Sequence, residues 1–356
     1  MTRPKYDNRY DDPTRAAHGA RRPRLRLTVA VLAGALILPL TGALAAPAAQ
    51  ALPAVPSPGD FVTWHRVDVK SPGGWPGIVA SGADGAIWYS DDNTGQLIRR
   101  DPVSGVMAGF SLGLGTTRVV AIAGAPDGAI WFSDMPNNVV GRLDPKSGAV
   151  TSTVFSGPSA WVARSIAFDS FGNAWMGGKN GVPGLTVVHP DGKSDVIADP
   201  LGRYPEALTV APNGHVWYAT DESPDIIDFD PATTSFTPVP VGAIESTFVA
   251  DVEVSRAGDI WVITDKGISS FATDGTILST SMLPSHPFFT KPTSLVAGEW
   301  AEMYFADGDG GYGRINYDDS LTLFRTPFVD GGTRSIAVDG FGAVWFTLES
   351  DHLAWF

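Results

Sequence analysis

Seven aromatic residues at nearly equal spacing constrain the fold of this 356-residue chain more than any other feature of its sequence. The intervals between them are 43, 44, 42, 44, 43 and 41 residues. Self-similarity at a fixed period of this size is typical of repeat architectures. The seven residues are Trp88, Trp131, Trp175, Trp217, Trp261, Tyr304 and Trp345. We call them the ladder aromatics, and they predict seven copies of one structural unit.

The residues around each ladder aromatic predict what the unit contains. In the second unit an apolar run, 119–122, precedes an Asp-Gly turn at 127–128, and an alternating segment then carries Trp131. Asp-Gly is a favoured two-residue hairpin turn, because both residues tolerate positive φ. Further strands are predicted at 139–143 and 150–155. Four short antiparallel strands per unit make a blade, so the sequence predicts an all-β, seven-bladed β-propeller over residues 60–356.

The two ends of the repeat region predict how the ring closes. The seventh unit stops at Phe356 after three strands, whereas a lone strand-like segment at about 61–70 precedes the first unit. We expect this segment to be the outer strand of the last blade, since such a clasp removes an exposed sheet edge. We also expect the ladder aromatics to pack between adjacent blades.

The first 51 residues have the composition of an export signal. A basic segment at 21–26 is followed by an apolar stretch at 27–44 and by repeated Ala-x-Ala patterns up to residue 51. This order is typical of a signal peptide. An uncleaved membrane anchor is the alternative, but Pro39 and the repeated Ala-x-Ala patterns favour cleavage. The sequence predicts a signal peptide at 1–51, a Pro-rich linker at 52–59 and a secreted protein.

Charge and the absence of cysteine exclude several classes of function. Residues 1–51 hold eight Lys and Arg and three Asp, which leaves 17 basic and 35 acidic residues, a formal charge of −18, in residues 52–356. Phosphate backbones and anionic lipids repel so acidic a body, so we expect neither nucleic acid nor a membrane surface as a partner after signal cleavage. Without Cys there is no disulfide, thiolate nucleophile or cysteine zinc site.

Candidate binding residues follow from the predicted hairpin of each blade. The residue eleven before the ladder aromatic and the residue three after it should be neighbours at the open end of this hairpin, at one mouth of the channel. The candidates are Arg164, Glu206, Thr293, Arg334, Asp91, Asp134 and Asp307. Arginines among carboxylates could hold an anionic or polar ligand. They could equally form a ring of ion pairs that ties neighbouring blades together.

Two phrases, DGAIWFSDMPNNVVGRLDPKSG (127–148) and GAVWFTLES (342–350), resemble the repeats of the streptogramin B lyase (virginiamycin B lyase) family. The resemblance implies a seven-bladed propeller that opens a cyclic depsipeptide ester by elimination, using magnesium and a histidine base. At the matching positions Thr293 replaces one family histidine, Gly332 replaces a metal-binding Glu, and Arg334 replaces the histidine base. Only Glu349 matches, as a metal ligand. Arg is not a base near neutral pH.

These departures favour an exported, monomeric, non-catalytic propeller that binds a small molecule, or an exported or cell-envelope partner, at the channel mouth. We expect no cofactor for this function. The alternative is a metal-dependent C–O lyase or a lactone-type hydrolase with a relocated site that uses Glu349, Asp307 and His352, for which magnesium or calcium would serve. A third alternative is a purely structural protein whose mouth is closed by ion pairs.

Overall fold

The computed structural model divides the chain into two units, Met1–Leu52 and Pro53–Phe356, and the propeller lies in the second. The structure describes residues 64–68, 76–115, 117–154, 162–179, 183–220, 223–242, 246, 248–284, 289–299, 301–327, 332–348 and 352–356. The predicted signal peptide, the linker and Glu349 lie outside these residues. In the described ranges no helix has the length and apolar character that crossing a membrane requires.

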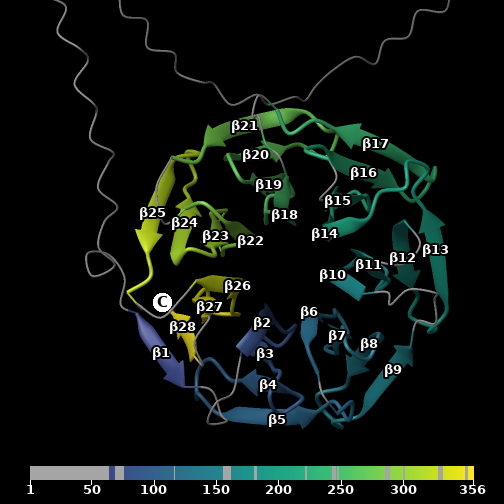
Figure 1. Cartoon of the computed structure of the whole chain (residues 1–356), viewed down its shortest axis with the longest axis vertical. Helices are drawn as coiled ribbons and strands as arrows, with labels where there is room; N and C mark the ends of the chain where they lie inside the picture. The colour runs from purple at the N-terminus through teal and green to yellow at the C-terminus, as the bar shows by residue number, and fades with distance from the viewer. Residues whose placement is uncertain are drawn as a thin grey trace, which may run out of the picture. The chain divides into compact units, whose positions relative to one another are not determined.

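The second unit consists of seven four-stranded antiparallel sheets arranged in a ring around a common centre (Figure 1). Blades 1–3 are formed by β2 (Pro76–Ser81), β3 (Ile87–Asp91), β4 (Gln96–Arg100), β5 (Met107–Ser111), β6 (Val119–Gly124), β7 (Ile130–Asp134), β8 (Val139–Leu143), β9 (Val150–Val154), β10 (Val162–Phe168), β11 (Ala174–Lys179), β12 (Gly184–Val188) and β13 (Ser194–Ala198). Blades 4–6 are formed by β14 (Pro205–Val210), β15 (Val216–Thr220), β16 (Ile226–Asp230), β17 (Ser235–Val239), β18 (Val249–Val254), β19 (Ile260–Thr264), β20 (Gly267–Phe271), β21 (Ile277–Met282), β22 (Pro292–Ala297), β23 (Met303–Asp307), β24 (Gly311–Ile315) and β25 (Leu321–Arg325). In these six blades the strands follow chain order from the centre of the ring outwards.

Blade 7 joins the two ends of the described chain and confirms the predicted clasp. Its strand order is β1 (His65–Asp68), β28 (His352–Trp355), β27 (Val344–Leu348) and β26 (Thr333–Val338), so the outer strand comes from the N-terminal side. The rings of His65 and Trp355 stack with their centroids 4.1 Å apart. The innermost strands of neighbouring blades touch in sequence, and β26 contacts β2, which closes the ring.

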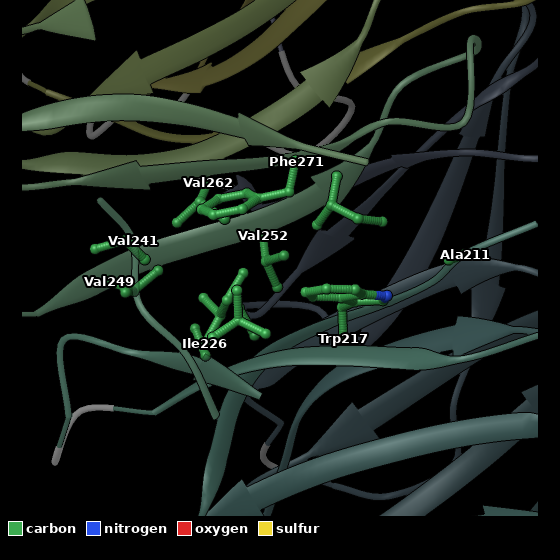
Figure 2. Close-up of a cluster of buried hydrophobic side chains, with 12 residues drawn as sticks. Ala211, Trp217, Ile226, Val241, Val249, Val252, Val262 and Phe271 are labelled. Atoms are coloured by element: carbon green, nitrogen blue, oxygen red, sulfur yellow. The ribbon is translucent and has the colours of Figure 1, made fainter. Parts of the chain in front are cut away.

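The hydrophobic core is divided among the interfaces between blades, as the ladder predicts. Trp217 of blade 4 lies in one cluster with Ile260, Val262 and Phe271 of blade 5 (Figure 2). Each of the other six ladder aromatics likewise packs against residues of the following blade. Burial of a large aromatic is among the strongest contributions to core energy, so these interfaces hold the ring together.

A buried aspartate fixes the ladder aromatic in two of the blades. In blade 7 the Asp339 carboxylate accepts hydrogen bonds from Nε1 of Trp345 at 2.9 Å and from the backbone N–H groups of Phe341 and Ala343 at 2.9 and 3.0 Å. Asp169 accepts the equivalent bond from Trp175 at 3.0 Å. One carboxylate thereby ties the first hairpin turn to the ladder aromatic.

We predict that Asp339→Ala destabilises the propeller by about 1–3 kcal/mol, because the buried donors that it satisfies lose their acceptor. The measurement is denaturant unfolding. Asp274→Ala, at an exposed turn where the carboxylate accepts one bond from the N–H of Thr276, is the matched control and should have the smaller effect. Equal losses for the two variants would contradict the assigned role of Asp339.

Candidate functional site

A β-bulge recurs at the start of the innermost strand of every blade. In six blades one residue of this strand has no partner on the second strand, and in blade 1 two residues, Gly77 and Ile78, have none. In blades 2–7 the unpaired residues are Val120, Arg164, Glu206, Ala250, Thr293 and Arg334. We call this set, together with Gly77 and Ile78, the bulge ring.

The bulge corrects one step of the sequence argument. The residue three places after the ladder aromatic pairs with the residue twelve places before it, not with the one eleven places before it. For example, Val119 pairs with Asp134, and Thr333 pairs with Leu348. The sequence argument was off by one position, because the extra residue of a bulge has no partner on the neighbouring strand. A bulge bends the strand and re-aims its side chain, and bulges are common next to functional sites.

Two members of the bulge ring form an ion pair between blades. Nε of Arg164 in blade 3 lies 3.1 Å from a carboxylate oxygen of Glu206 in blade 4, with the two side chains 49% and 19% exposed. Arg334 in blade 7 is exposed at the equivalent bulge. Thr293 in blade 6 donates a long hydrogen bond of 3.5 Å to the Thr333 carbonyl. Ion pairing between blades and an exposed guanidinium therefore coexist in the bulge ring.

The three candidate aspartates are buried and hold loops. Asp91, Asp134 and Asp307 are at most 1% exposed. Asp134 accepts a 2.7 Å bond from the Arg118 N–H, and Asp307 accepts bonds of 2.9 Å from the N–H groups of Lys291 and Asp309. Burial raises the pKa of Asp307 to about 6 despite these bonds. These carboxylates shape the loops beside the bulge ring and turn little surface to solvent.

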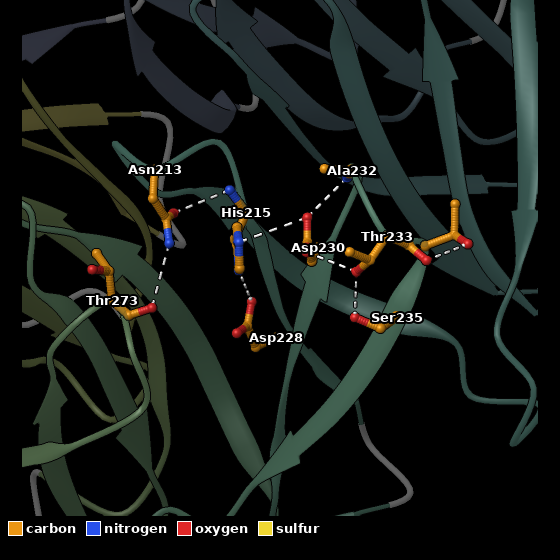
Figure 3. A network of polar contacts seen from close by, with 9 residues as sticks. Asn213, His215, Asp228, Asp230, Ala232, Thr233, Ser235 and Thr273 are labelled. Atoms are coloured by element: carbon orange, nitrogen blue, oxygen red, sulfur yellow. Dashed lines mark hydrogen bonds and ion pairs between the residues drawn. The ribbon is translucent and has the colours of Figure 1, made fainter. Parts of the chain in front are cut away.

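His215 and His352 occupy structural positions. His215 Nδ1 lies 2.8 Å from Asp228, and its Nε2 lies 3.7 Å from Asp230 (Figure 3). This cluster borders the hairpin turn of blade 4, at the opposite end of that hairpin from the bulge. His352 interacts with the Arg66 guanidinium across the clasp, with 2.8 Å between its Nδ1 and Nη2. Among the described residues no three His, Asp or Glu side chains are grouped as metal ligands.

Two acidic residues that the sequence argument missed stand on the innermost strand of blade 5. On β18, Asp251 pairs with Ile263 and Glu253 pairs with Trp261. The equivalent positions of the other blades hold apolar side chains, Ser or Thr. Asp251 accepts bonds from the N–H groups of Leu295 in blade 6 and of Val252 at 2.7 and 2.8 Å. Burial raises the pKa of Asp251 to about 7, and burial together with the Asp251 charge raises that of Glu253 to about 8.

Comparisons with known proteins support the fold. No protein-family model matches the chain, and a sequence search of curated proteins gives no match. Among solved structures, a streptogramin B lyase is 21% identical with a TM-score of 0.72, over 82% of this chain and 96% of that one. A catalytically inactive virginiamycin B lyase from Staphylococcus aureus with quinupristin is 18% identical with a TM-score of 0.73, over 82% and 98%.

A more distant similarity extends to the extracellular domain of a hybrid two-component system from B. thetaiotaomicron. It is 14% identical with a TM-score of 0.67, over 83% of this chain and 41% of that one. At these identities the comparisons show a shared propeller fold. They confirm the architecture that the sequence resemblance implied.

We predict that the free energy of unfolding decreases as the pH rises from about 4 to about 8, because of Asp251 and Glu253. Their pKa values are higher in the folded than in the unfolded chain, so the folded state binds more protons in this window and its stability decreases as pH rises. Thermal unfolding of the wild type and of the Asp251→Asn, Glu253→Gln double variant should show a shallower decline for the variant. Parallel pH profiles would contradict this assignment.

Proposed function

We propose that the chain is an exported propeller that binds an anionic small molecule, or an exported partner presenting such a group, at the bulge-ring end of its channel, without catalysis. The observation that carries the proposal is the bulge repeated in all seven blades. Because a bulge re-aims a side chain, this repetition gathers one variable position per blade around one opening. Two of these positions carry guanidinium groups, Arg164 and Arg334.

The position that matches the family's metal-binding glutamate supports a loss of catalysis. A Cβ atom on Gly332 would lie 1.7 Å from the carbonyl oxygen of Gly308, far inside van der Waals contact. No side chain fits there unless the backbone moves. The base position holds Arg334, which stays protonated near neutral pH. A scaffold with these substitutions is better suited to hold an anion than to abstract a proton.

The choice of an anionic group follows from the chemistry of arginine. A guanidinium presents paired N–H donors that match carboxylate and phosphate oxygens. Arg164 pairs with Glu206 and is 49% exposed, and Arg334 is exposed at the equivalent bulge, so both guanidinium groups lie at the surface of the bulge ring. The neighbouring aspartates compete little with the ligand for the guanidinium groups, since Asp134 and Asp307 are buried and accept hydrogen bonds from backbone N–H groups.

We predict that citrate, used as a polyanionic probe at constant ionic strength, raises the melting temperature of the wild type, because a ligand bound to the native state stabilises it. Arg334→Ala should lose most of this increase. Arg314→Ala removes an exposed guanidinium from β24 and is the charge-matched control that should keep it. An unchanged citrate effect in Arg334→Ala would refute the site.

The lyase alternative is supported by the shared fold and by Glu349. It predicts magnesium-dependent opening of a cyclic ester, whereas the binding proposal predicts that the ester stays intact. Under the binding proposal we expect the protein to leave the ester of quinupristin intact, with or without magnesium, when the reaction is followed by liquid chromatography with mass spectrometry, because elimination gives a linear isomer of unchanged mass. Magnesium-dependent ring opening would replace the binding proposal by the lyase alternative. Addition of water to the ester would instead identify a hydrolase.

A further inference from the structure

The ladder aromatics are covered in a regular way that singles out one interface. In each blade the first residue of the second strand pairs with a residue at the end of the third strand; in blade 7 this pair is Val344 with Phe356. The ladder aromatic of the preceding blade packs near this third-strand residue, which we call the covering residue. Along the ladder from Trp88 to Trp345 these covering residues are Leu143, Val188, Phe229, Phe271, Ile315, Phe356 and Arg100. Five are large apolar side chains, and the exceptions are Arg100 and Val188.

At Trp345 the cover is a cation. The Arg100 guanidinium lies over the indole, with its Cζ 4.7 Å from the ring centroid. Trp is the strongest aromatic partner for a cation, and a guanidinium is its commonest protein partner. The Trp355 ring also stacks on this indole, with centroids 5.4 Å apart, so a guanidinium here takes the covering position that a large apolar residue holds in five other blades.

At Trp131 the cover is incomplete. Val188 pairs with Ala174 just as Arg100 pairs with Ile87, but its side chain is the shortest of the seven. Trp131 is only half-buried, whereas the other five ladder tryptophans are at most 8% exposed. Trp131 and Val188 both line a cavity of about 690 Å³ between blades 2 and 3. We call this cavity the interblade groove.

The rest of the interblade groove adds aromatic surface and little net charge. Phe168 meets Trp131 edge-on with ring centroids 6.0 Å apart, and Phe171, which is 81% exposed, lies at the rim. Arg142 also lines the groove, but its guanidinium is paired with Asp127 at 2.8 Å. The formal charge of −18 over residues 52–356 attracts cations to such a site.

We propose that the interblade groove binds a small molecule that carries a guanidinium group, stacked on Trp131 as Arg100 stacks on Trp345. The volume is in the range of sites that bury small ligands, and the walls combine aromatic faces with a few fixed polar groups. This site lies between two blades and is independent of the bulge-ring proposal, so either can fail alone.

The test compares two probes of the same shape by isothermal titration calorimetry. Propylguanidinium mimics the ligand group, and propylurea is its planar, uncharged counterpart. The wild type should bind propylguanidinium roughly 2- to 30-fold more tightly than propylurea, the range expected for a cation over an indole. Equal affinities, or no binding of propylguanidinium, would overturn the proposal.

Variants of the covering residue complete the test. Val188→Arg supplies the guanidinium internally and should abolish binding while leaving the melting temperature unchanged or higher. Val196→Arg, the same substitution at an exposed position of β13 that does not line the groove, should bind as the wild type does. Trp131→Phe retains an aromatic ring and should reduce the preference for the charged probe, which gives a second readout if Val188→Arg does not fold. Undiminished binding in a folded Val188→Arg, or an unreduced preference in Trp131→Phe, would place the probe elsewhere.

Discussion

Burial of one large aromatic between each pair of neighbouring blades is the interaction on which the rest of the structure depends. A four-stranded blade with two apolar faces has no core of its own and is stable only when both faces are covered. Trp217 illustrates this, because its cluster includes five buried residues of the next blade, Val249, Val252, Ile260, Val262 and Phe271. The requirement repeats around the ring, so it is satisfied only when β26 reaches β2 and the clasp completes blade 7. In such an assembly each interface stabilises its two neighbours, as in other repeat proteins.

The architecture was readable from the sequence because its determinants are periodic and local. A ladder aromatic every 41–44 residues, a turn before it and a missing fourth strand at the C-terminal end were sufficient to predict seven blades and their closure. The bulge was not readable, since the extra residue recurs in every blade and therefore does not disturb the spacing of the ladder aromatics. The aspartates at 91, 134 and 307 were assigned to the mouth by position, and only coordinates reveal that backbone N–H groups occupy their oxygens. Asp251 and Glu253 could have been noticed as acidic residues at positions that are small or apolar in the other blades.

The bulge separates two tasks within a short stretch of each blade. The paired residues on either side continue the sheet and the core, while the bulge residue is released from the pattern of pairs. Its identity can therefore vary without loss of the fold, and across the blades it ranges from Gly and Ala to Arg and Glu. The interblade groove arises differently, from a core position where Val188 is shorter than its counterparts. One scaffold thus offers two kinds of variable position, one at the start of the innermost strand and one between blades.

The clasp also determines how the ring responds to mechanical load. β1 and β28 are antiparallel, and His65 at the start of β1 lies opposite Trp355 at the end of β28. A force that draws the two ends of the propeller apart acts on the same edge of this pair. The strands would then peel apart one pair after another instead of shearing all at once, beginning with the ring contact of Trp64 with Phe356 and then the stacked rings of His65 and Trp355. Blade 7 is accordingly the point at which tension opens an otherwise continuous ring.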